Sequence, residues 1–293
     1  PVKTVQNGVD IDLAGIGGVS TLYSHRGKGY MGILLKYAFK EMERQRFPLS
    51  ILGGDRHRYN NFGYENGGTV VTLNILPRGL EKYDINAIPS YRYDNTDRKI
   101  LGKIMRYYED INYRRKRTLD DFENIYKRYG INVYYAERGK RFAFVVISAT
   151  EVRDDRMKNV LEFGCSPELI PCILQHLIEK FGFAGFSIVF PEFHEIPANL
   201  MSLASSWNIG SPRMIKIINL RQTMEIFSKW KNFLFPDNEE ITLTIKDKES
   251  VVITKKGGVL KIVSGRGKNE ISLTETDMVR FLFGASLWVP DEI

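Results

Sequence analysis

The stretch VSTLYSHRGKGYMG, residues 19–32, joins an expected strand to an expected helix through a basic, glycine-rich turn. Before it, residues 13–21 are apolar and interrupted by glycines, as in a strand whose backbone a ligand can approach closely. After it, the apolar spacing predicts an amphipathic helix over residues 29–46, with an apolar stripe formed by Ile33, Leu34, Tyr37, Ala38 and Met42. Because a helix N-terminus offers unpaired N–H groups and a positive dipole end, this turn predicts a pyrophosphate site.

The residue types of the turn fit this prediction. Gly27 and Gly29 permit a tight turn and the close approach of phosphates, and Arg26 and Lys28 add positive charge. The P-loop pattern Gly-Lys-Ser/Thr is absent from the turn. Residues 27–32 do read Gly-x-Gly-x-x-Gly, but no acidic residue closes the following strand at residues 49–52, as a dinucleotide site requires. Taken alone, the turn is equally compatible with a solvated surface loop.

The residues from Arg26 to Met31 resemble the signature R/Q-x-x-G-x-G/A of the GNAT N-acetyltransferases. In that family an amphipathic helix with paired leucines follows, here Leu34 and Leu35, whereas Met31 replaces the usual small residue. The resemblance implies that acetyl-CoA is the cosubstrate. It implies that the backbone of Val19, Ser20 and Thr21 binds the pantetheine arm. It also implies that the pyrophosphate is held by Arg26, Gly27, Lys28, Gly29, Tyr30 and Met31.

A second segment, RYNNFGYE at residues 58–65, resembles the family segment lYeklGFe at the expected distance downstream. The first tyrosine of that segment commonly lies near the CoA sulfur. The resemblance therefore implies that Tyr59 protonates the departing thiolate and that Asn60 contacts the cofactor. A tyrosine, with an ordinary pKa of about 10, is protonated at neutral pH and suits the acid role. The general base stays open among three nearby side chains, Asp55, His57 and Glu65.

Strand and helix patterns along the chain predict a mixed α/β (α+β) fold in three blocks, residues 1–95, 96–212 and 213–293. The first block adds strands at 49–52 and 69–75. In the second block we expect two helices within 97–129, a hairpin over 131–149, a helix capped by Ser166 and a strand at 186–190. In the third we expect a strand at 215–220, a helix at 222–233, strands at 241–246, 250–254 and 259–263, and a helix at 275–283.

This order of blocks resembles the enhanced intracellular survival acetyltransferases. The resemblance implies a catalytic GNAT domain at 1–95, a degenerate GNAT-like domain at 96–212 and a sterol carrier protein-like domain at 213–293. The second block lacks the Arg-x-x-Gly turn, so we expect it to be structural or to form a wall of the acceptor cleft. The family often uses its C-terminal carboxylate as base and often forms homo-oligomers. We expect native residues to be missing at both ends, so Ile293 is not assigned this role.

Composition narrows the partners further. Lys and Arg number 42 and Asp and Glu 35, giving +7, but the basic residues are scattered and no nucleic-acid motif surrounds Arg114–Arg117. The two cysteines, Cys165 and Cys172, are not in a C-x-x-C pattern, so we expect neither a metal site nor a disulfide. No signal peptide or membrane-length apolar run is visible, and we expect a cytoplasmic protein that binds neither nucleic acid nor membrane.

We therefore expect an acetyl-CoA-dependent N-acetyltransferase that acts on a primary amine of a small molecule or peptide by direct attack. Two alternatives stay open: a lipid or small-hydrophobe binding protein that acts through residues 213–293, and a catalytically inactive GNAT that senses CoA. Because an acceptor cleft is assembled from distant segments, the sequence does not identify the acceptor.

Overall fold

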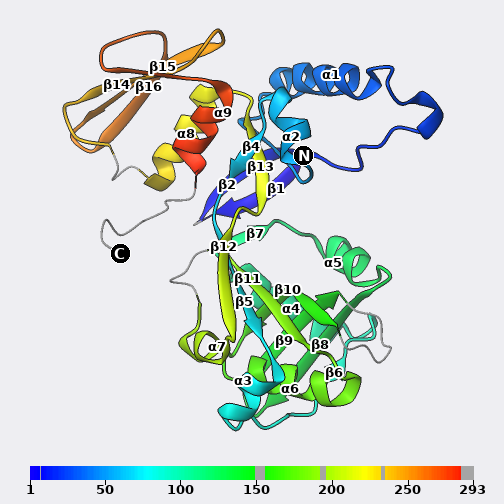
Figure 1. The fold of residues 1–293 in the computed structure, drawn as a ribbon. Helices are drawn as coiled ribbons and strands as arrows, with labels where there is room; N and C mark the ends of the chain where they lie inside the picture. Colours follow the sequence, from blue (N-terminus) through cyan, green and yellow to red (C-terminus); the bar gives the residue numbers. More distant parts are fainter. Residues whose placement is uncertain (7, 149–155, 192–195, 232–234, 285–293) are drawn as a thin grey trace, which may run out of the picture. The chain divides into compact units, whose positions relative to one another are not determined.

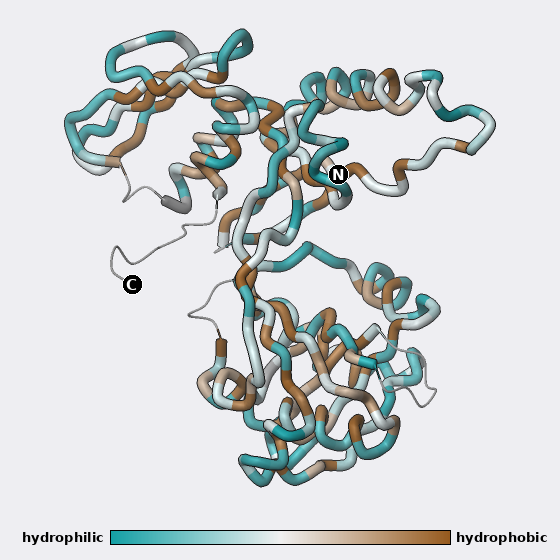
Figure 2. The backbone as a smooth tube through the Cα atoms, in the orientation of Figure 1, coloured by the Kyte–Doolittle hydropathy of each residue, from teal (hydrophilic) through white to brown (hydrophobic). Residues whose placement is uncertain are grey.

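The computed structural model describes residues 1–6, 8–148, 156–191, 196–231 and 235–284 (Figure 1). The chain forms two compact units. The first combines Pro1–Gly68 with the chain from Ser211 onward, and the second is Thr69–Gly210. Hydrophobic residues concentrate on the strands of each unit, as the colouring of Figure 2 shows. The mixed α/β fold predicted from the sequence is confirmed.

The first unit is built around a sheet in which the strands lie in the order β4-β13-β3-β2-β1. Their bounds are β1 Val2–Gln6, β2 Val9–Ile16, β3 Leu49–Leu52, β4 Glu65–Gly67 and β13 Arg213–Ile217. Strands β2 and β3 run parallel, and helix α1 (Tyr30–Arg44) makes the crossover between them. Strand β13 lies antiparallel between β3 and β4, although more than a hundred residues separate it from both in the chain.

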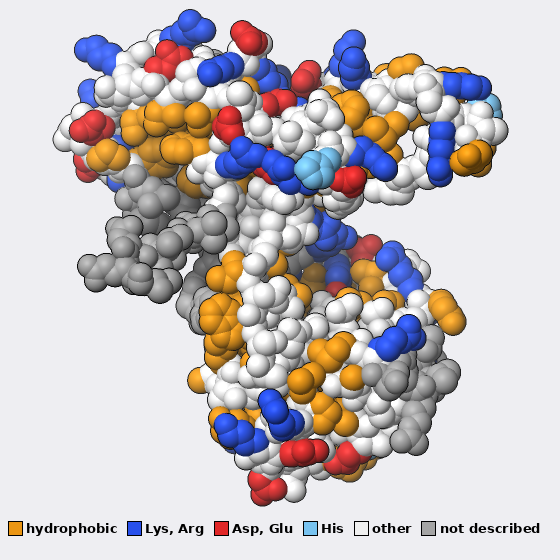
Figure 3. Space-filling view, viewed as in Figure 1, with side chains coloured by type: hydrophobic (Ala, Val, Ile, Leu, Met, Phe, Trp, Pro, Cys, Tyr) orange, Lys and Arg blue, Asp and Glu red, His pale blue; other side chains and the backbone are white. Residues whose placement is uncertain are grey.

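Helix α1 departs from the predicted stripe. Its buried residues are Leu35 and Met42, whereas Ile33, Leu34 and Tyr37 are 63 %, 68 % and 71 % exposed. At about 100° per residue, Ile33 and Tyr37 lie roughly opposite Leu35, and Leu34 lies about a quarter turn away from it, so the predicted stripe joined different faces of the helix. Figure 3 shows hydrophobic side chains, drawn in orange, at the surface along this helix.

The C-terminal part of the first unit is a second sheet with two helices. Its strands lie in the order β16-β15-β14-β17. The bounds are α8 Leu220–Lys231, β14 Glu240–Ile245, β15 Glu249–Lys256, β16 Val259–Ser264, β17 Glu270–Leu273 and α9 Glu275–Phe283. Its core includes Leu243, Val251 and Met278, and this core continues into Leu49 of β3. The C-terminal part is thus packed onto the first sheet.

The second unit has one sheet in the order β12-β5-β11-β10-β9-β8-β6. Its strands are β5 Val70–Ile75, β6 Tyr91–Arg92, β8 Ile131–Arg138, β9 Arg141–Ser148, β10 Met157–Cys165, β11 Gly185–Phe190 and β12 Ser206–Gly210, with β7 Tyr113–Arg115 outside this order. Its helices are α3 Pro77–Lys82, α4 Arg98–Glu109, α5 Leu119–Tyr126, α6 Leu169–Phe181 and α7 Ala198–Leu203. In β9, Val145 packs in the α6 core while Phe144 and Val146 pack in the α4–α5 core, as the two-residue period of a strand requires.

Several elements differ from the expected ones. The strand predicted over 13–21 ends at Ile16, and the helix expected to be capped by Ser166 begins only at Leu169, where Ser166 accepts a bond through its carbonyl. Strand β5 pairs with β11 and β12, and β13 completes the first sheet. The compact units therefore change at 68/69 and 210/211 rather than at 95/96 and 212/213. In the described residues, no helix is long and apolar enough to cross a membrane.

Candidate functional site

The site begins where two parallel strands end. Strands β2 and β3 pair as far as Ile16 opposite Leu52. Beyond this point each strand is followed by two glycines, Gly17–Gly18 after β2 and Gly53–Gly54 after β3. Gly18 and Gly54 have positive φ. Ligands of open α/β sheets bind outside the carboxyl ends of parallel strands. The end of β2 and the crossover helix after it therefore frame the candidate site.

The turn between β2 and α1 presents free backbone donors. A short 3-10 helix, η1 (Tyr23–His25), precedes Gly27 and Gly29, whose φ angles are +78° and +75°. Gly29 occupies the N-cap of α1 and has no side chain to accept a bond from the first N–H groups of the helix. These N–H donors and the positive end of the helix dipole both lie at the N-terminus of α1. The predicted strand–turn–helix geometry is present.

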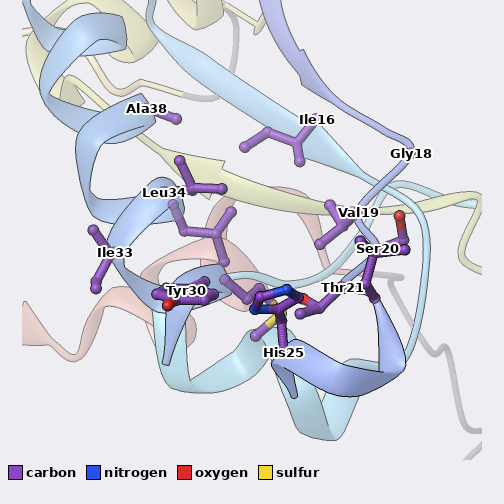
Figure 4. A pocket seen from close by; sticks show the side chains of 13 residues that line it. Ile16, Gly18, Val19, Ser20, Thr21, His25, Tyr30, Ile33, Leu34 and Ala38 are labelled. Carbon is purple, nitrogen blue, oxygen red and sulfur yellow. The ribbon is translucent and has the colours of Figure 1, made fainter. Parts of the chain in front are cut away.

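A pocket of about 580 Å³ lies between the end of β2 and helix α1 (Figure 4). Five of the predicted cofactor residues line it: Val19, Ser20, Thr21, Tyr30 and Met31. The sequence prediction missed the other lining residues, which are Ile16, Gly18, Leu22, His25, Ile33, Leu34, Leu35 and Ala38. Adjacent apolar residues on the predicted helix were the signal that could have found Ile33 and Leu34. The remaining turn residues, Arg26–Gly29, are exposed.

The lining is largely apolar, which explains why exposed hydrophobic side chains gather here. Leu22, Ile33 and Leu34 are 75 %, 63 % and 68 % exposed. The rings of His25 and Tyr30 lie 6.3 Å apart at the pocket edge. An apolar pocket beside the N–H groups of a helix N-terminus suits a ligand that has a thin, weakly polar arm and an anionic end.

Tyr59 lies behind the wall of this pocket. It ends helix α2 (Arg56–Tyr59), and Asp55 caps that helix by accepting the His57 N–H at 2.9 Å. The Tyr59 ring is 4 % exposed and packs with Leu35, which also lines the pocket. A Cβ atom on Gly54 would lie 2.9 Å from this ring, so the glycine permits their close approach. The ring is therefore held between the pocket helix and the backbone that follows β3.

The three candidate bases occupy different environments. Asp55 caps helix α2, and His57 is exposed. Glu65 is 2 % exposed and is paired with Arg56 and Arg280, each at 2.5 Å. Hydrogen bonds from Arg56 lower the pKa of Glu65 to about 2, with further help from the Asn66 N–H and the charge of Arg280. A carboxylate held in this way is a poor proton acceptor at neutral pH, so Glu65 is a structural anion rather than a base.

Asn60 is placed among the same groups. It opens the 3-10 helix η2 (Asn60–Phe62), and its side-chain amide donates to Glu65 Oε2 at 3.2 Å and to the Tyr64 carbonyl at 3.4 Å. These contacts fix the segment between Tyr59 and Glu65. Its contact with the cofactor stays a prediction.

The lowered pKa of Glu65 predicts how the stability of the protein changes at acidic pH. Because the folded-state value of about 2 lies below the ordinary value of 4.5, the stabilisation is present above about pH 4.5 and is lost as the pH falls toward 2. We expect this group to contribute about 2–3 kcal/mol to the free energy of unfolding near neutral pH. Urea unfolding of the wild type and of Glu65→Gln across this pH range measures the contribution. Glu225→Gln, which removes an exposed carboxylate of α8, is the control, and equal acid slopes in Glu65→Gln and wild type would contradict the assignment.

The described residues contain no group of three or more His, Cys, Asp or Glu side chains placed to hold a metal ion. Ile293, to which the sequence analysis assigned no role, lies outside the described residues.

Comparison with known proteins agrees with this geometry. Residues 1–67 match the family model for the acetyltransferase (GNAT) domain. A search of curated proteins finds no match. A probable N-acyltransferase from Enterococcus faecalis V583 is similar in structure, with a TM-score of 0.69 at 19 % identity over 96 % of this chain and 74 % of that chain.

Two further solved structures have the same fold. A GCN5-related N-acetyltransferase from Anabaena variabilis ATCC 29413 has a TM-score of 0.63 at 17 % identity, over 95 % of this chain and 74 % of that chain. Eis1 from Mycobacterium abscessus also has 0.63, at 13 % identity, over 97 % of this chain and 75 % of that chain. Residues 1–67 therefore match a GNAT acetyltransferase domain, and the mixed α/β fold of the chain resembles those of solved acetyltransferase structures.

Proposed function

We propose that this protein transfers the acetyl group of acetyl-CoA to a primary amine of a small molecule or peptide by direct attack. One observation carries the proposal: the apolar pocket at the end of β2 opens beside the glycine-capped N-terminus of α1. The pocket suits the pantetheine arm, and the free N–H groups suit the pyrophosphate. No cofactor-binding motif other than the GNAT turn is needed to explain this pairing.

The residues present fit acetyl-CoA. The backbone of Val19–Thr21 would bind the pantetheine arm, and the turn from Arg26 to Met31 would hold the pyrophosphate. A Cβ atom on Gly27 or Gly29 would meet nothing within 4 Å, so the space above both residues is open to a ligand. Bound acetyl-CoA supplies the thioester carbonyl that an amine attacks.

Tyr59 would act as the acid of the reaction. As the amine nitrogen forms a bond to the acetyl carbon, the carbon–sulfur bond breaks and its electron pair passes to sulfur. The Tyr59 hydroxyl then gives its proton to the thiolate. The amine loses a proton to water or to a general base, which we do not assign to a residue. Tyr64 is less suited, because burial raises its pKa to about 12 and its hydroxyl hydrogen-bonds Ser50 Oγ at 2.6 Å.

Thermal stability tests the cofactor site directly. Acetyl-CoA and CoA at about a hundred times their dissociation constants should each stabilise the protein by about 2.7 kcal/mol, whereas ATP should not. A protein that responds to neither acetyl-CoA nor CoA would rule out a working cofactor site. Binding without transfer to spermidine, an aminoglycoside or a lysine-containing peptide would favour the CoA-sensing alternative.

Charge reversal in the turn tests where the phosphates lie. The double substitution Arg26→Glu with Lys28→Glu should weaken CoA binding on the order of 10-fold, because both side chains are exposed and flank the helix N-terminus. Isothermal titration with CoA measures the change. Lys36→Glu with Lys40→Glu makes the same charge change on exposed positions farther along α1 and should have a smaller effect. Equal losses in the two variants would point to long-range charge instead of contact.

The remaining parts of the family resemblance are consistent with this function. We infer that residues 96–212 correspond to a degenerate GNAT-like domain and that residues 213–293 correspond to a sterol carrier-like domain. Lipid binding by the C-terminal part is less favoured, since Leu243, Ile245, Val251 and Ile253 are all at most 3 % exposed and fill its own core. From the same family resemblance we infer that the protein forms a homo-oligomer.

A further inference from the structure

Helix α9 of the C-terminal part contacts the segment that carries Tyr59. Figure 1 shows α9 (red) beside strands β4 and β13. The Gly68 N–H donates to the carbonyl of Phe283 at 2.6 Å, which joins the end of α9 to the end of β4. Two groups of charged side chains make further contacts along this line, and both involve residues 59–65.

The first charged group surrounds Glu65. This carboxylate is 2 % exposed, and Arg280 of α9 donates to its Oε2 at 2.5 Å. Arg56 donates to both carboxylate oxygens, and the Asn60 amide donates to Oε2 as well. A buried carboxylate needs such partners, because an unpaired buried charge is costly. The position of Glu65 therefore depends on α9.

The second charged group lies directly against Gly63. Lys216 of β13 is 6 % exposed and pairs with Glu275 of α9 at 2.6 Å. A Cβ atom on Gly63 would lie 2.0 Å from Glu275 Oε2 and 2.6 Å from Lys216 Nζ. Lys248 also pairs with Glu275, at 2.9 Å. The turn after Tyr59 is thus packed directly against the first turn of α9.

Both groups connect to the Tyr59 ring through short paths. Asn60, which follows Tyr59 in the chain, bonds to Glu65. The Tyr64 N–H donates to the Tyr59 carbonyl at 3.3 Å, and the Tyr64 ring meets the Tyr59 ring edge-on at 6.4 Å. A change at Glu65 therefore reaches Tyr59 through the backbone and through the neighbouring ring.

We propose that helix α9 holds Tyr59 in its packed position beside Leu35 of the pocket wall, with Arg280 as a positioning residue that acts through Glu65 and Asn60. The proposal rests on the proposed function insofar as it concerns turnover. It makes the C-terminal part a component of the transferase site, although Arg280 lies 215 residues from Glu65 in the chain.

Kinetics of Arg280→Ala provide the first test. Turnover with the best acceptor of the amine panel, followed by CoA thiol release, should fall on the order of 10-fold, because a misplaced reacting group is costly in rate. Binding of CoA should be unchanged, since the turn at α1 is untouched. Arg280→Lys, which keeps a cation near Glu65, should recover part of the rate. Arg221→Ala is the matched control, because Arg221 is similarly exposed, pairs with Glu225 within α8 and should leave turnover unchanged.

A double-substitution cycle separates positioning from general loss of structure. In a Tyr59→Phe background, Arg280→Ala should cause little further loss, since its effect passes through the tyrosine hydroxyl. Equal fold-losses in both backgrounds, or unchanged turnover in Arg280→Ala, would overturn the proposal.

A measurement without turnover keeps the two proposals apart. In protein labelled with 3-fluorotyrosine, the ¹⁹F resonance of Tyr59 is identified by its loss in Tyr59→Phe. It should move by more than its linewidth in Arg280→Ala and stay in place in Arg221→Ala. A moved resonance in a protein that transfers no acetyl group would keep the positioning role and reject the enzyme function. An unmoved resonance would reject the positioning role whatever the activity.

Discussion

Tyr59→Phe should lower turnover by about 100-fold or more while leaving acetyl-CoA binding nearly intact. The substitution removes the hydroxyl alone. The ring that packs with Leu35 and against Gly54 is kept, so the pocket wall should not change. Steady-state kinetics with a thiol reagent gives turnover, and titration with CoA gives affinity.

Tyr64→Phe is the control for this experiment. Tyr64 is also a buried tyrosine of the same segment, but its hydroxyl is bonded to Ser50 on β3. We expect Tyr64→Phe to cost about 1 kcal/mol of stability and little turnover. If the two variants lose turnover equally, the acid role does not belong to Tyr59, and unchanged turnover in Tyr59→Phe removes it from the mechanism.

Gly63→Ala should reduce the free energy of unfolding by about 2–4 kcal/mol. Gly63 has a φ of +80°, where an alanine is strained, and the new methyl group would overlap both Glu275 and Lys216. These side chains are restrained, because Lys216 is 6 % exposed and is ion-paired with Glu275 at 2.6 Å. Urea unfolding followed by circular dichroism measures the loss.

Gly27→Ala separates the two causes. Gly27 has nearly the same φ, +78°, but a Cβ atom there would meet nothing within 4 Å. Its loss should be limited to backbone strain, about 1 kcal/mol. Equal losses of unfolding free energy in the two variants would mean that Lys216 and Glu275 move aside easily to make room for the methyl group. That result would also weaken the case that α9 holds this segment.

Local features of this protein were predictable from local sequence. The turn from Arg26 to Met31 folds as expected because glycines at two positions allow positive φ, and because a helix start depends on a few neighbouring residues. The hairpin of β8 and β9 around Gly139 and the helix at 275–283 were likewise predicted from short-range patterns. The turn proposed to bind the cofactor is of this kind, since phosphate binding would use consecutive backbone donors.

The face that α1 buries was not predictable in this way. Apolar residues lie on both sides of the helix, and only the position of the sheet decides that Leu35 and Met42 are covered while Ile33, Leu34 and Tyr37 are not. The sequence also placed residues 69–75 with the first block, whereas their strand pairs with β11 and β12. Strand pairing between distant segments leaves no local mark on either strand.

The surroundings of the tyrosine segment depend on tertiary structure for the same reason. By itself, the sequence predicted the glycine turn proposed to bind the cofactor and the tyrosine proposed as the acid, because each belongs to a short motif with its own backbone geometry. Only the folded chain decided that Glu65 is an anion paired with two arginines rather than a base, and that α9 contacts the segment that carries Tyr59. The physical reason is that the charge state of a carboxylate depends on what surrounds it in space, and here one of its partners is 215 residues away.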